Sequence, residues 1–295
     1  SDAQTARATA FQRYKQLPGI HMGKGKQSSS TEPKGWKTIR PLALASLHGL
    51  VSLLGRRNAT KGDPKLALAL LTRFRSLVPY FIPFPRMAKT MLKSLLAYWS
   101  RSTEHLEGPQ KREVQQIRLS AYTAIWDLST AVPAPFLDLA LKGSYLTYVR
   151  RSRSAPASGG GAGAEAISTA VEKAAAQAFM ASCIVEMYGI DLGSSYQCAF
   201  LYIRQLALHL RTAYAKKTKE SFAMVLSWQF LSSLRLWTLV LSAYPGPEEL
   251  QPLIYPLTQV IQGSMKLLPT SKFLPLRLHC IRLLQQLAAA SGLFC

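Results

Sequence analysis

The chain has 295 residues, with 36 Lys and Arg against 15 Asp and Glu, which gives a formal net charge of +21. Because 48% of the residues are hydrophobic, the chain can bury the core of one or two domains, which excludes a disordered polyelectrolyte. The excess of positive charge predicts a polyanionic partner, with nucleic acid as the first candidate and a membrane surface as the second.

Residues 1–37 are predicted to form a flexible basic segment, because Gly, Pro, Ser and Lys occur there without apolar periodicity. From residue 38 onward, apolar residues recur at steps of three and four, and alternating strand-like runs are hard to find. The predicted helices are 38–54, 64–78, 86–100, 110–131, 135–149, 166–188, 195–216, 219–243, 250–268 and 274–290.

Prolines stand at or near most joints between these helices, where the fixed φ angle and the missing N–H end one helix or begin the next. A tract rich in Gly, Ala and Ser at 151–165 is predicted to be a linker between a helical lobe at 38–150 and a second helical lobe at 166–295. Helix pairs of roughly forty residues indicate an all-α fold, namely an α-solenoid of HEAT-like or armadillo-like antiparallel pairs. A strict repeated sequence motif is not found.

The segment 253–284 has helical spacing but is interrupted by Pro256, Pro269 and Pro275. These prolines suit a helix start, a helix end and the entry to the next helix, so the segment is predicted to be a helical corner. Its candidate core residues are Leu257, Val260, Ile261, Leu276 and Ile281.

The longest uncharged apolar runs, such as 221–234, are expected to be too short for a membrane span, which needs roughly 18 residues, and they contain Ser and Gln. We therefore expect a soluble protein. No signal peptide is visible, and because the chain begins at Ser1 we expect it to be a piece of a longer protein. Cys183, Cys198, Cys280 and Cys295 show no CxxC spacing. Buried, reduced thiols in an intracellular protein are therefore expected.

Motifs for catalysis are missing from the sequence. It contains no P-loop, no HExxH pair and no GxSxG elbow, and the glycines at 159–163 lack the Lys that phosphate binding needs. His209 and His279 stand alone among apolar residues, which is typical of a histidine on a helix face with a local hydrogen bond. We expect no enzymatic activity, no cofactor, no metal and no small-molecule substrate.

Basic residues cluster at predicted loops and helix ends, where they are free to meet phosphates. Arg204 and Arg211 lie seven residues apart on one side of a helix, off the apolar stripe formed by Ala199, Ile203, Leu206 and Leu210; a solvated face is an equal alternative for them. The candidate polyanion-binding residues are Lys24, Lys26, Arg150, Arg151, Arg153, Arg204, Arg211, Lys216, Lys217, Lys219, Lys266, Lys272 and Arg277.

Three aromatic residues are candidates for a partner interface, namely Trp228, Trp237 and Tyr255. Tryptophan is enriched at interface hot spots and also in cores. For the two tryptophans, core packing is the more frequent outcome.

Five parts of the sequence are distinctive when taken together: "FPRMAKTMLKSLLAYW" (84–99), "LKGSYLTYVRRS" (141–152), "YIRQLALHLR" (202–211) with the "KKTKE" that follows, the "WQF" and "LRLW" spacing (228–237), and the proline-interrupted segment 253–284. Through them the chain, from about residue 77 to the end, resembles the nucleolar complex protein 2 family of ribosome-assembly factors. Residues 1–60 match only loosely, so the chain is expected to be a central portion of such a protein.

The resemblance implies a nucleolar and nuclear helical-repeat protein without enzymatic activity. It implies pairing with nucleolar complex protein 1 or 3, and binding to the pre-60S precursor of the large ribosomal subunit, including its ribosomal RNA. A nuclear protein–protein adaptor, whose positive charge meets acidic protein tails without direct RNA binding, is the alternative. Neither hypothesis involves a membrane.

Overall fold

The computed structural model describes residues 36–55, 64–103, 106, 108–132, 136–153, 164–246, 249–268 and 270–292. Within these ranges the regular structure is entirely helical, which confirms the all-α prediction. The helices are α2 (Trp36–Gly55), α4 (Pro64–Leu77), α5 (Pro85–Trp99), α6 (Gly108–Ala131), α7 (Phe136–Arg151), α8 (Ala164–Tyr188), α9 (Leu192–Lys216), α10 (Lys219–Val225), α11 (Trp228–Ala243), α12 (Ile254–Leu267) and α13 (Leu274–Ser291). Short 3-10 turns are η1 (Val78–Phe81), η2 (Gln251–Leu253) and η3 (Ser271–Phe273).

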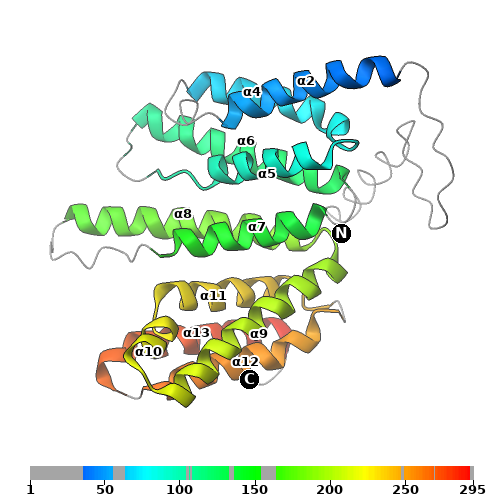
Figure 1. Ribbon diagram of the computed structural model, residues 1–295. Helices are drawn as coiled ribbons and strands as arrows, with labels where there is room; N and C mark the ends of the chain where they lie inside the picture. The colour runs from blue at the N-terminus through cyan, green and yellow to red at the C-terminus, as the bar shows by residue number, and fades with distance from the viewer. Residues whose placement is uncertain are drawn as a thin grey trace, which may run out of the picture.

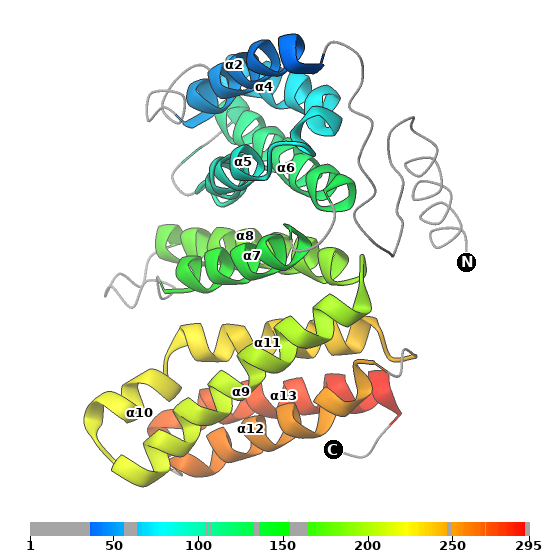
Figure 2. The same cartoon turned by 45° about the vertical axis from the view of Figure 1, so that its right-hand side comes forward.

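The helices are stacked in successive layers along the molecule (Figure 1). Helices α2 and α4 form one end, α5 and α6 lie next, and α7 packs beside α8 in the middle. The other end is a group in which α9 and α11 cover α12 and α13, as the turned view shows (Figure 2). A continuous cluster of buried apolar side chains extends from α2 to α13.

Local sequence explains most helix boundaries. Pro85 occupies the first position of α5, where its missing N–H costs nothing. Asp191 accepts a hydrogen bond from Ser194 N and caps α9, and Thr218 forms a capping box with Ser221 at the start of α10. Lys217 ends α9 in the left-handed region, with φ of 52°.

The predicted single helix 219–243 is wrong, because the chain breaks between α10 and α11. Leu226 leaves the helical conformation, and the Ser227 side chain accepts a hydrogen bond from Phe230 N at 3.2 Å. This side chain caps a new helix at Trp228, so α10 and α11 can take different directions.

The helical corner predicted at 253–284 is present as α12, η3 and α13. Leu257, Val260 and Ile261 are buried, and Leu276 is half-buried, as expected. Ile281 is exposed, so its assignment to the core is wrong. The buried stripe of α13 instead contains Cys280, Leu283 and Leu287, and Ile281 is rotated by about one residue step away from it.

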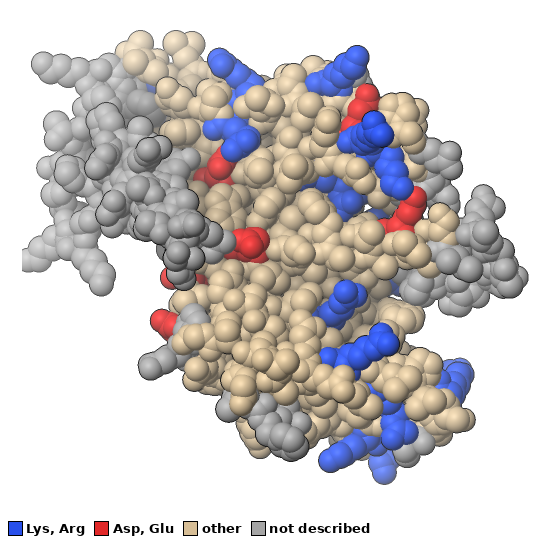
Figure 3. Space-filling view, turned by 180° about the vertical axis from the view of Figure 1, so that it is seen from behind, with Lys and Arg blue, Asp and Glu red and all other residues tan. Residues whose placement is uncertain are grey.

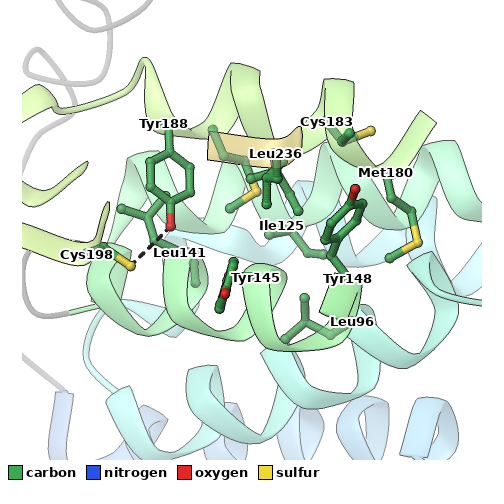
Figure 4. Packing of buried hydrophobic residues seen from close by; sticks show 14 of the residues in the cluster. Leu96, Ile125, Leu141, Tyr145, Tyr148, Met180, Cys183, Tyr188, Cys198 and Leu236 are labelled. Carbon is green, nitrogen blue, oxygen red and sulfur yellow. Dashed lines mark hydrogen bonds between the residues drawn. The ribbon is translucent and has the colours of Figure 1, made fainter. Parts of the chain in front are cut away.

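Aromatic rings fill the contact between the middle layer and α9 and α11. The Trp237 ring centroid lies 5.2 Å from that of Tyr145, 5.5 Å from that of Tyr188 and 6.2 Å from that of Tyr202. Figure 4 shows Tyr188 and Cys198 joined by a hydrogen bond of 3.1 Å beside Tyr145 on α7. Burial raises the pKa of Tyr188 well above its usual range.

The thiols of Cys183, Cys198 and Cys280 are free and buried, as predicted, whereas Cys295 lies outside the described residues. Burial raises the pKa of Cys183 and of Cys280 to about 11. These thiols are therefore neutral at physiological pH.

Two helical segments, Thr38–Gly55 and Lys219–Ala243, are long and apolar enough to cross a membrane by length and composition. This differs from the expectation that apolar runs are too short. Core helices of soluble proteins also meet this criterion; 61% of the second segment is buried, and it is broken at Ser227. The absence of a membrane partner stays a prediction.

The division into two lobes also stays a prediction, because the linker tract 151–165 and the segment 1–37 fall largely outside the described residues. Helix α7, which ends the first predicted lobe, packs against α8, α9 and α11 of the second.

Candidate polyanion-binding surface

The first basic segment stands at the end of α7. Arg150 and Arg151 are the last two residues of this helix, Arg153 follows in the turn, and all three side chains are exposed. Cations suit this position because the carbonyl groups at a helix C-terminus carry partial negative charge. Local electrostatics therefore explains their location at a helix end. The side chains of Arg150 and Arg153 are exposed and can meet an anion.

The second basic segment connects α9 to α10. Lys216, Lys217 and Lys219 are exposed around the tight turn that the left-handed Lys217 makes. Glu220, in the first turn of α10, is the acidic neighbour on this turn.

The third basic segment is the corner between α12 and α13. Lys266 is exposed in the last turn of α12, and Lys272 is exposed in η3. Arg277 is half-buried in the first turns of α13.

The three segments lie on the same side of the molecule (Figure 1), and two hydrogen bonds between distant residues hold their helices in place. Tyr214 Oη donates to Gly263 O at 2.7 Å, which ties the end of α9 to the end of α12. Gln229 Nε2 donates to Val149 O at 3.1 Å, which ties the start of α11 to the end of α7. We call the nine basic residues of these segments the basic end of the molecule; they are Arg150, Arg151, Arg153, Lys216, Lys217, Lys219, Lys266, Lys272 and Arg277.

The acidic residues are too few to neutralise this region. From 192 to 292 the sequence contains ten Lys and Arg but only Glu220, Glu248 and Glu249 as acids. In Figure 3 the blue side chains at the lower right, over the side where α9, α10, α12 and α13 meet, have no red side chains among them, whereas the blue side chains of the upper half have red ones beside them. A surface of this kind attracts phosphates, and its attraction falls with added salt.

The remaining basic candidates lie elsewhere. Arg204 and Arg211 are exposed along α9, and the apolar stripe predicted beside them is buried as expected. Lys24 and Lys26 lie outside the described residues. Sequence reasoning missed Lys142, an exposed residue of α7 that stands two turns before Arg150. Its spacing of eight residues from Arg150, which puts both on one face of the helix, could have indicated it in the sequence.

The candidate partner residues have different environments. Tyr255 is 71% exposed and Trp228 is 45% exposed, with the Trp228 ring edge-to-face against His279 at 6.1 Å. Trp237 is completely buried, so it cannot contact a partner, and its place among the interface candidates is corrected to the core. Its ring is needed to fill the space between α7, α8 and α9.

The two histidines considered for catalysis line small pockets. His209 lines a pocket of about 180 Å³ between α7, α9 and α11, and His279 lines one of about 150 Å³ beside Trp228 and Lys272. Neither lining contains a carboxylate. Among the residues that the structure describes, His, Cys, Asp and Glu form no group that could hold a metal ion.

Comparisons with known proteins agree with the resemblance seen in the sequence. The model of the Noc2p family matches residues 135–295. Nucleolar complex protein 2 of Drosophila melanogaster is 34% identical over 97% of this chain and 35% of its own length. Nucleolar complex-associated protein 2 of Arabidopsis thaliana is 31% identical over 90% of this chain and 31% of its own length.

A nucleolar complex protein 2 homolog of Caenorhabditis elegans is 30% identical over 83% of this chain and 30% of its own length. The chain thus spans about a third of the length of these relatives. Because the family model covers more than half of the chain, and the relatives align over most of it, the chain belongs to the Noc2p family.

Proposed function

We propose that this chain is part of a non-catalytic scaffold for large ribosomal subunit assembly, which binds pre-ribosomal RNA through its basic end. The relatives are named as nucleolar complex proteins, and the protein is nucleolar and nuclear, with a role related to ribosome biogenesis. The single observation that carries the proposal is the gathering of three basic helix ends, remote in sequence, on one side of the molecule.

The stacked helices support a scaffold role. We propose that the layers correspond to HEAT-like or armadillo-like pairs, because such stacks present long continuous surfaces to their partners. A nucleolar complex protein of type 1 or 3 is the proposed partner. Tyr255 and Trp228 remain its candidate contacts, since both are aromatic and exposed.

The pockets around His209 and His279 contain no acid–base pair among the described residues, which supports a non-catalytic role at these two places. Their volumes also lie below the roughly 300 Å³ of pockets that enclose a whole drug-sized substrate. The two proposed lobes would then act as binding surfaces joined at 151–165.

The test is the salt dependence of RNA binding by the purified chain. Each phosphate contact contributes about −0.7 to −0.9 to the slope of log K against log salt concentration. Six to nine contacts at the basic end therefore predict a slope on the order of −4 to −8 for a segment of precursor ribosomal RNA. Equal binding at low and high salt, or none at low salt, would remove the RNA part of the proposal.

The alternative is a protein adaptor whose positive charge meets acidic tails, and the same charges favour it. Crosslinking in cells separates the two functions. Crosslinks from the basic end to ribosomal RNA support the scaffold, whereas crosslinks to proteins alone support the adaptor.

A further inference from the structure

A small pocket lies beside the basic end, between α7, α9 and the joint of α10 and α11. Its volume is about 180 Å³. Tyr145 and Tyr202, both almost fully buried, are part of its lining, and Leu146 and Met224 are partly exposed beside them. This volume is below the range of pockets that hold a whole cofactor. The space can hold a single ring of a ligand whose other parts stay outside the pocket.

Polar side chains also line this pocket. Gln205, which is exposed, and His209, which is half-buried, are one turn apart on α9. Neither makes a hydrogen bond to another described residue, so both can bond to a ligand that replaces water. Gln229 donates its Nε2 to Val149 O, which leaves its amide oxygen as an acceptor. An amide and an imidazole together provide the donors and acceptors that match the edge of a nucleobase.

Cations flank the pocket on both sides. On α7, Lys142, Leu146 and Arg150 follow at steps of four, so the two cations stand one turn to either side of a pocket residue. On α9, Lys216 lies seven residues after His209, two turns further toward the basic end. An RNA strand that crosses the pocket would thus meet positive charge before and after it.

We propose that this pocket binds one unpaired RNA base, while Lys142, Arg150 and Lys216 contact phosphates on either side of that nucleotide. The proposal rests on the proposed RNA-binding function and adds that the ligand is single-stranded at this point. Bases inside an A-form duplex are stacked and paired, so they cannot enter a pocket of this size. An apolar side chain from a protein would displace water from Gln205 and His209 without replacing its hydrogen bonds, whereas the edge of a base can replace them.

The first test compares a short single-stranded RNA of mixed sequence with its own duplex, by fluorescence anisotropy on the purified chain. The double variant Gln205→Leu/His209→Leu should weaken binding of the single strand at least about fivefold, because one base–pocket contact contributes about 1–3 kcal/mol. Duplex binding should change by less than about twofold, since phosphate contacts are unaltered. Gln259→Leu/His48→Leu, the same exchanges at exposed positions of α12 and α2, is the matched control.

A second variant guards against loss of folding. Leu146→Trp, at a residue that is 42% exposed, fills the pocket and keeps its polar groups. It should reproduce the selective loss of single-strand binding with unchanged circular dichroism and melting temperature. RNA that contains 4-thiouridine should crosslink in the peptide that includes residues 205–209.

The outcomes separate this inference from the function on which it rests. If both pocket variants bind single strand and duplex as the wild type does, with the usual salt dependence, the pocket is not a base site although RNA binding stands. If crosslinks occur only at the lysines of the basic end, the inference also fails. If the wild-type chain binds neither RNA at low salt, the proposed function fails first, and the inference fails with it.

Discussion

Two tryptophans on α11 show how different the environments of one residue type are in this molecule. Trp237 is completely buried against three tyrosines, whereas Trp228, at the first position of the same helix, is 45% exposed. Sequence spacing could not separate them, because both stand in an apolar helical pattern. The difference arises because α7, α8 and α9 pack around Trp237, whereas the Trp228 ring lies at the edge of α13 against His279.

Trp237→Ala should lower the free energy of unfolding by about 3–5 kcal/mol, because it removes a large buried ring and leaves a cavity between tyrosines. Trp228→Ala is the matched control, with an expected loss of less than about 1 kcal/mol. Urea unfolding followed by circular dichroism measures both. Equal losses for the two variants would show that Trp237 is not the centre of this core.

Buried tyrosines predict a loss of stability in alkaline solution. Burial raises the pKa of Tyr148 and of Tyr202 to about 12, against 10.0 for an exposed tyrosine. Above pH 10 the unfolded chain therefore binds fewer protons than the folded chain, and the free energy of unfolding falls as pH rises toward 12. Each tyrosine contributes up to about 1.4 kcal/mol per pH unit in this window.

Urea unfolding at several pH values from 9 to 12 measures this slope. Tyr148→Phe removes one titrating group, so the decline between pH 10 and 12 should be shallower by one such contribution. Phe at this site also loses the bond to Ser232 O, which lowers stability at neutral pH but not the pH slope. A variant with the same slope as the wild type would contradict the assignment.

At the level of elements, the break between α10 and α11 depends on Ser227. Ser227→Ala removes the acceptor for Phe230 N and should destabilise the protein by about 0.5–2 kcal/mol. Ser227→Asp keeps an acceptor oxygen and adds a favourable charge at the helix N-terminus, so it should retain most of the stability. Thermal melts of the two variants compare them directly. If alanine and aspartate have the same effect, the cap does not maintain the break.

Helix positions were largely predictable from the sequence, because apolar residues at steps of three and four and prolines at the joints act locally. The stripe from Ala199 to Leu210 is buried as its spacing indicates. The break at Ser227 was missed because apolar residues continue through it, so no local pattern marked it. The exposure of Ile281 was missed because the partner face of α13, not its composition, decides which stripe is buried.

The candidate site was predictable in its parts but not in its arrangement. Basic residues at helix ends are visible in the sequence, and they lie where the sequence placed them. Their gathering depends on bonds such as those of Tyr214 to Gly263 and of Gln229 to Val149, which join residues 49 and 80 positions apart. The pocket with Gln205 and His209 depends on the same packing, so neither feature follows from local patterns.

For the whole molecule, net charge and stacking have different consequences. A formal charge of +21 favours any polyanion and predicts association rather than a particular site. The basic end lies where α7, α9, α10 and the α12–α13 corner meet, so we expect the polyanion to bind there. A site-directed test must therefore compare equal numbers of charges at two places.

Charge reversal at the basic end shows whether RNA binds at this place or to the overall charge. Lys216, Lys219 and Lys272, all exposed, are replaced together by Glu, and the control is the same reversal at Arg86, Lys89 and Lys93, which are exposed on α5. The readout is binding of a precursor ribosomal RNA segment as a function of salt, with circular dichroism as the check of folding. We expect at least a tenfold loss of affinity at low salt for the first variant, with a salt slope less steep by about 2–3, and a much smaller change for the control. Equal losses for both variants would contradict a localised site and leave only the attraction of the overall charge.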